Sequence, residues 1–219
     1  MTRYGRRAKL LAAGLSALAG FVDATGFIAL DGFFVSFMSG NTTLFAVGLA
    51  QGTMSAVIAL GLIGLFVLGV MAGTLTGHFA RTQRAASVLG LVALLLAAAA
   101  MLGKLGHTGA AAAAMALAMG VENAVFAREG DVHIGVTYMT GTLVKFGRNL
   151  TMALLGGERW AWRPYLLLWL GLASGAVMGA LAWRYLGLGN LWLAALAAGG
   201  FALAAARTPL LVPQPAVLE

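Results

Sequence analysis

Long apolar segments constrain the fold of this chain more than any other feature. Six of them are candidate membrane spans, and they cover residues 10–30, 55–79, 86–103, 109–127, 163–185 and 189–206. A helix needs about 20 predominantly apolar residues to cross the hydrocarbon core of a bilayer. The segments therefore predict an all-α polytopic membrane protein with about six transmembrane helices, whose first partner is the lipid bilayer.

Composition supports this prediction and excludes several other classes of protein. Of the 219 residues, 61% are hydrophobic and only 10% are charged, whereas a soluble domain carries about 25% charged residues. The net charge of +7 fits the basic cytoplasmic ends of membrane helices. Since basic residues do not form a stripe with interleaved aromatics, we expect no nucleic-acid partner. Cysteine is absent, which excludes disulfides and thiol chemistry.

Two further segments, residues 33–53 and 132–156, are apolar but interrupted by polar residues. The first contains Ser39-Gly40-Asn41-Thr42-Thr43, and the second contains Thr140-Gly141-Thr142 followed by Lys145 and Arg148. We expect each to be a discontinuous or re-entrant segment with a break at the flexible Gly40 or its counterpart. Whether either crosses the membrane completely is left open by the sequence.

An internal repeat of about one hundred residues relates the two halves. Residues 35–41 (VSFMSGN) match residues 136–142 (VTYMTGT) at an offset of 101, and Gly20, Asp23 and Ala24 match Gly120, Asn123 and Ala124 at an offset of 100. The glycine spacing of residues 69, 73 and 77 recurs at 171, 175 and 179, an offset of 102. Glycines four residues apart are typical of packing seams between membrane helices. We expect two repeats, 1–105 and 106–206, and an irregular tail, 207–219.

The distribution of positive charge favours six crossings over eight. With a cytoplasmic N-terminus, six crossings place 12 of the 14 basic residues on the inside, as the positive-inside rule requires. Eight crossings would bury Lys145 and Arg148, each at a cost of at least about 2.5 kcal/mol. Three crossings per repeat make the two repeats inverted, as in many transporters. The basic N-terminus also fits a secretory signal, but its counterpart in the second half favours a retained span.

The first repeat holds five candidate site residues. Asp23 is a carboxylate within an apolar span, which suggests a coupling group or a partner for Lys145; the alternative is a structural hydrogen bond that caps the 33–53 segment. Ser39, Gly40, Asn41 and Thr42 are candidates because such residues cap a half-helix whose free N–H groups bind anions. The alternative is that they only hydrogen-bond to neighbouring helices.

The second repeat holds the corresponding candidates. Glu122 and Asn123 form a polar pair near the end of a span, although a solvated Glu122 is an equal alternative. Thr140, Gly141 and Thr142 repeat the first polar element. Lys145 and Arg148 share a helix face at i, i+3, where they attract an anionic solute or, as the favoured alternative, contact lipid headgroups.

Signatures of catalysis and of bound cofactors are missing from the sequence. It contains no His-Glu-x-x-His helix, nucleophile elbow or phosphate-binding glycine loop, so we expect no enzyme and no cofactor. Glu129, Asp131 and His133 lie close together but lack regular ligand spacing, so we expect no metal site.

At these residues the sequence resembles the YoaK family, small bacterial membrane proteins defined by a domain of unknown function. The resemblance lies in Asp23-Ala24, the lead-in Phe33-Phe34-Val35, and the element Phe37-Met38-Ser39-Gly40-Asn41-Thr42, and it extends over residues 8–206. It implies a bacterial inner-membrane protein with about six spans, and no established substrate.

Two functions remain open from the sequence. The favoured prediction is a small secondary transporter or channel for a small polar or anionic solute, with Asp23 as the coupling carboxylate and the Ser/Thr/Asn elements lining the site. The alternative is a non-transporting scaffold or accessory subunit, in which polar residues only join helices. Because six short spans enclose little volume, a homodimer is a further expectation.

Overall fold

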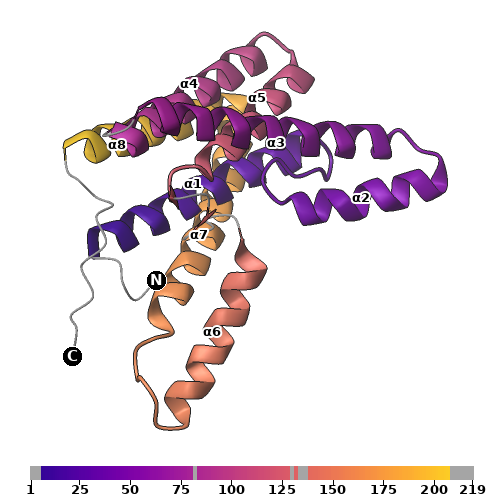
Figure 1. Ribbon diagram of the computed structural model, residues 1–219. Helices are drawn as coiled ribbons and strands as arrows, with labels where there is room; N and C mark the ends of the chain where they lie inside the picture. The colour runs from indigo at the N-terminus through magenta and orange to yellow at the C-terminus, as the bar shows by residue number, and fades with distance from the viewer. Residues whose placement is uncertain (1–5, 81–82, 129–130, 133–137, 208–219) are drawn as a thin grey trace.

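The computed structural model describes residues 6–80, 83–128, 131–132 and 138–207 (Figure 1). Glu129 and His133, which belong to the metal question raised by the sequence, lie outside the described residues, and so do Val136, Thr137 and residues 208–219.

The described chain is helical apart from one short strand pair. Each of the six apolar segments falls on a helix. The elements are α1 (Arg6–Ala29), α2 (Met38–Gln51), α3 (Ser55–Phe79), α4 (Arg84–Lys104), α5 (Thr108–Glu122), β1 (Ala127–Arg128), β2 (Asp131–Val132), α6 (Met139–Leu154), α7 (Arg163–Leu186), the 3₁₀ turn η2 (Gly187–Asn190) and α8 (Leu191–Arg207). The two strands pair antiparallel.

Four stretches are long and apolar enough to cross a membrane: Ala8–Ala29, Ser55–Phe79, Arg84–Lys104 and Arg163–Arg207. The last stretch contains both α7 and α8, which η2 separates. Helix α5 is shorter than the expected span 109–127, since it ends at Glu122 after 15 residues. At about 1.5 Å per residue it falls short of the roughly 30 Å hydrocarbon core.

The helices pack around a common core, in which α1 pairs with α7 and α3 pairs with α5. Helix α1 packs along α7, α3 packs along α5, and α4 lies against both α5 and α8. The hairpins α2–α3 and α6–α7 extend away from the centre in different directions (Figure 1). Many large apolar side chains on these hairpins are exposed, including Val47, Leu68, Val144 and Val177, as expected for surfaces that face lipid rather than water.

Glycines allow the two helices within each of these pairs to come close to each other. A Cβ on Gly69 or Gly73 of α3 would meet the carbonyl oxygen of Leu117 or Val121 in α5. A Cβ on Gly175 or Gly179 of α7 would likewise meet the carbonyl of Ala17 or Phe21 in α1. These glycines therefore form packing seams, as the spacing indicates.

The contacts correct the register in which the glycine triplets correspond. Leu117 and Val121 lie 100 positions after Ala17 and Phe21, but their glycine partners Gly69 and Gly73 lie 106 positions before Gly175 and Gly179. The offset of 102 expected from the sequence therefore differs from this value by four residues, about one helical turn. Gly77 has a different neighbour, because its Cβ position is filled by the side chain of Arg84.

Candidate functional site

The site begins where the chain between α1 and α2 is not helical. Helix α1 ends at Ala29, and Asp31 and Gly32 have positive φ values of 53° and 107°. Helix α2 then starts at Met38, with Phe37 at its N-cap. The expected break at Gly40 is therefore wrong, since Ser39, Gly40 and Asn41 lie in the first turn of α2. The interruption precedes the polar residues instead of falling among them.

Asp23 and Asn41 hold this non-helical segment in place. The Oδ1 atom of Asp23 accepts hydrogen bonds from the backbone N–H groups of Val35 at 2.8 Å and Ser36 at 2.7 Å. The Asn41 side chain bonds Phe34 at both polar backbone atoms: its Oδ1 accepts from Phe34 N at 3.0 Å, and its Nδ2 donates to Phe34 O at 2.6 Å. These bonds satisfy backbone groups that would otherwise be unpaired inside an apolar region. Asp23 thus makes the capping contact that the sequence left as an alternative to a functional charge.

Gly40 serves close packing instead of flexibility. A Cβ at Gly40 would lie 2.5 Å from the Phe37 ring and 2.9 Å from the Phe34 ring. Phe34 also stacks on Phe27, with ring centroids 4.9 Å apart, and meets Phe37 edge to face at 5.2 Å. The aromatic lead-in therefore fixes the start of α2 against the end of α1.

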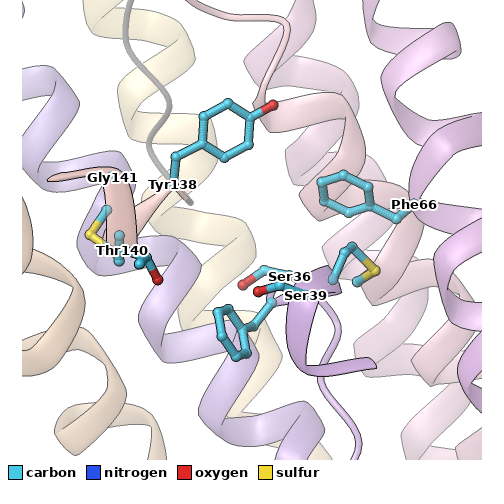
Figure 2. A pocket seen from close by; sticks show the side chains of 9 residues that line it. Ser36, Ser39, Phe66, Tyr138, Thr140 and Gly141 are labelled. Atoms are coloured by element: carbon cyan, nitrogen blue, oxygen red, sulfur yellow. The ribbon is translucent and has the colours of Figure 1, made fainter. Parts of the chain in front are cut away.

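A cavity of about 290 Å³ lies where the starts of α2 and α6 meet (Figure 2). Ser36 and Ser39 approach it from one side and Thr140 from the facing side, with Tyr138 and Phe66 at its edge (Figure 2). Among the described residues, the lining consists of Ser36, Phe37, Met38, Ser39, Phe66, Tyr138, Met139, Thr140 and Gly141. Segments 101 residues apart in the sequence therefore meet at one polar site.

Both helices present their N-terminal ends to this cavity without side-chain caps. Neither Phe37, the N-cap of α2, nor Tyr138, the N-cap of α6, makes a capping hydrogen bond through its side chain. Backbone bonds satisfy part of the first turn of α2, because Gly40 N and Asn41 N donate to Phe37 O. Ser39 N has no backbone acceptor among the described residues. Free N–H groups and the positive end of the helix dipole make such ends favourable to anions.

The other candidates lie beside the cavity instead of lining it. Thr42 is exposed and its hydroxyl donates to Met38 O at 2.8 Å, whereas Thr142 is buried and its hydroxyl donates to Tyr138 O at 3.1 Å. Lys145 and Arg148 are exposed farther along α6. They lie on a different part of that helix from Thr140 and Gly141, which do line the cavity.

Glu122 and Asn123 lie at the buried end of α5. Asn123 is 5% exposed, and its Nδ2 donates to Met119 O at 2.8 Å. Glu122 has no exposed surface, so the alternative of a solvated carboxylate is wrong. Helix α5 ends against α3 and α4 instead of reaching the protein surface, which is why a residue near a span end is buried here.

Several lining residues were missed by reasoning from the sequence: Ser36, Phe37, Met38, Phe66, Tyr138 and Met139. All but Phe66 belong to the repeated stretches 35–41 and 136–142, so the repeat itself carried the signal. The aromatic and Met residues among them carry no polar pattern that marks a binding site. Phe66 comes from the middle of an apolar helix, and only the tertiary packing places it here.

A family model for proteins of unknown function, DUF1275, matches residues 11–204 of this sequence. The chain belongs to the DUF1275 family. A UPF0700 transmembrane protein, RA0705, from Rhizobium meliloti (strain 1021) is 38% identical over 200 residues, which are 91% of this chain and 86% of that relative. No solved structure matches the chain.

Membership of DUF1275 agrees with the membrane character of the chain. The relative is named a transmembrane protein, and the family match covers every helix from α1 to α8 in whole or in large part. The expected relationship is confirmed at this level, as an uncharacterised family of transmembrane proteins. The narrower YoaK name stays a prediction.

Proposed function

We propose that this DUF1275 protein is a small secondary transporter or channel for small anions, with the cavity between α2 and α6 as its central binding site. The observation that carries the proposal is the meeting of two helix N-termini, both without side-chain caps, at one largely apolar cavity that also includes serine and threonine side chains from both segments. A scaffold needs no such cavity between two helix N-termini.

The chemistry of the cavity favours an anion over a cation. Among the described residues no charged side chain lines it; its polar groups are the hydroxyls of Ser36, Ser39 and Thr140 together with helix N-termini. Hydroxyls and N–H groups donate hydrogen bonds to an anion, and the two helix dipoles add positive potential. Without a fixed cation, binding is weak enough to allow release, which transport requires.

The size of the cavity is sufficient for a small ion. Its volume of about 290 Å³ is on the order of ten water molecules at about 30 Å³ each. An inorganic oxyanion or a halide with part of its hydration shell fits this space.

The membrane arrangement is part of the same proposal. Two duplicated, inverted halves with six crossings bring α2 and α6 into the membrane from opposite faces, as discontinuous helices do in many transporters. The N-terminus is cytoplasmic and the host is a bacterial inner membrane, in keeping with the positive-inside rule. In this arrangement Lys145 and Arg148, both exposed on α6, contact lipid headgroups.

Flux through purified protein in liposomes tests the proposal, with chloride, nitrate and sulfate as probes. We expect protein-dependent flux of at least one probe and a loss of that flux in the double variant Ser39→Ala and Thr140→Val, which removes two hydroxyls from the cavity without filling it. Thr74→Val is the matched control, because Thr74 is exposed on α3 and its hydroxyl donates to Val70 O within its own helix. Flux of all three probes no faster than in empty liposomes would overturn the proposal and favour the scaffold or accessory-subunit alternative.

A further inference from the structure

Glu122 is a buried carboxyl group without a hydrogen-bond partner. Its side chain has no exposed surface, and neither Oε1 nor Oε2 has a partner among the described residues. Asp23, by contrast, is satisfied by two backbone N–H groups, and Asp31 and Glu158 are exposed. An unpaired carboxylate in a dry interior is strongly unfavourable, whereas the protonated acid is neutral. The fold therefore accommodates Glu122 as a neutral acid.

A second unpaired group lies at the same end of α5. The Nη2 atom of Arg84, at the start of α4, approaches Ala124 O at 3.4 Å, and its Nε is buried without a partner. Gly77 leaves the space that the Arg84 side chain fills. Arg84 thus approaches the chain two residues beyond Glu122, yet it forms no ion pair with Glu122 in this structure. An ion pair between a deprotonated Glu122 and Arg84 would need one of the two side chains to move.

The remaining charged and titratable groups on the helices that pack against α5 are engaged or exposed. Helix α3 carries only His78, which is exposed near its end, and α4 carries, besides Arg84, only Lys104, exposed at the opposite end. Helix α1 contributes Asp23, which is bound to Val35 and Ser36, and its other charged residues, Arg6, Arg7 and Lys9, all lie at its far end.

Helix packing connects Glu122 to the cavity. Gly120, two residues before Glu122, is in close contact with the backbone carbonyl of Phe66, and the Phe66 side chain lines the cavity. A change of charge on Glu122, whose side chain points to another face of α5 than Gly120, would therefore act on the cavity through the packing of α5 against α3.

We propose that Glu122 is a proton-binding site that couples proton movement to anion transport, an inference that rests on the proposed function. Glu122 takes up one proton from water as the anion enters the cavity, so that proton and anion bind together and no net charge is added. When the proton returns to water on the other side, the carboxylate pairs with Arg84 and the anion is expelled. Only the O–H bond of the carboxyl group forms and breaks.

Proteoliposomes that contain a trapped pH indicator test this coupling, with nitrate, chloride and sulfate again as probes. We expect an inward anion gradient to acidify the interior for the wild-type protein. We expect Glu122→Gln, which mimics the protonated acid, to keep anion exchange and to lose the acidification. Glu158→Gln is the matched control, because Glu158 is exposed at the α6–α7 turn, and we expect it to behave as the wild type does.

The outcomes separate the two proposals. If the wild type transports anions and Glu122→Gln still acidifies the interior, the coupling role is overturned and the proposed function stands. If no probe crosses, both fall. Should Glu122→Gln not fold, proton uptake by unbuffered wild-type protein in detergent decides: about one proton per bound anion supports the role of Glu122, and none overturns it.

Discussion

The carboxylate of Asp23 in α1 accepts a hydrogen bond of 2.7 Å from the backbone N–H of Ser36, a residue that lines the cavity. Through this bond and its companion to Val35, the end of α1 sets the position at which the chain enters the site. Asp23 therefore positions the cavity wall without lining it.

The bonds at Asp23 predict that an acceptor, rather than a charge, is needed there. We expect Asp23→Asn to keep most of the stability, since an amide oxygen accepts the same bonds, and the corresponding residue in the second half is Asn123. We expect Asp23→Ala to lower the free energy of unfolding by about 1–3 kcal/mol for each buried N–H left unpaired. Thermal unfolding in detergent measures both. Equal losses in the two variants would show that the charge matters.

The Asn41 side chain must both donate and accept a hydrogen bond, because its Oδ1 accepts from Phe34 N and its Nδ2 donates to Phe34 O. We expect Asn41→Asp to be nearly as destabilising as Asn41→Ala, although Asp is isosteric, because a carboxylate cannot donate to Phe34 O. The melting temperatures of the two variants give the answer. An Asn41→Asp protein as stable as the wild type would contradict the two-way bond.

The glycine seam between α3 and α5 predicts a sharp contrast within one helix. Gly69→Ala would drive a methyl group into Leu117 O, and we expect it to destabilise the protein by about 1–3 kcal/mol through overpacking. Gly64→Ala, five residues earlier on α3, meets no atom within 4 Å. We expect it to be neutral or stabilising by up to about 1 kcal/mol, since Ala is the better helix former. Resistance to thermal unfolding ranks the pair, and similar values for both variants would argue against the seam.

The inverted arrangement predicts opposite accessibility at the two hairpin turns. Thr53 lies in the α2–α3 turn and Gly157 in the α6–α7 turn, and both are exposed. The chain has no cysteine, so we expect Thr53→Cys to react with an impermeant thiol reagent on intact cells. We expect Gly157→Cys to react only after permeabilisation. Labelling of both from the same side would show that the halves are parallel.

Sequence alone identified the membrane class of the chain and the places where helices form. The apolar segments fall on α1, α3, α4, α5, α7 and α8, because a bilayer accepts little other than apolar helices. The polar stretches near residues 39 and 140 were identified as special, because buried polar groups are rare and need a reason. These inferences rest on local composition, which the sequence displays directly.

Only the tertiary structure decided how these elements meet. Glycines at every fourth position look the same after a shift of one turn, so the sequence could not choose between an offset of 102 and the 106 that the contacts give. The start of α2 at Met38 depends on bonds from Asp23, 12 and 13 residues away. Likewise, the burial of Glu122 depends on α3 and α4 covering the end of α5. Each of these features is set by contacts between distant segments, and local pattern does not record them.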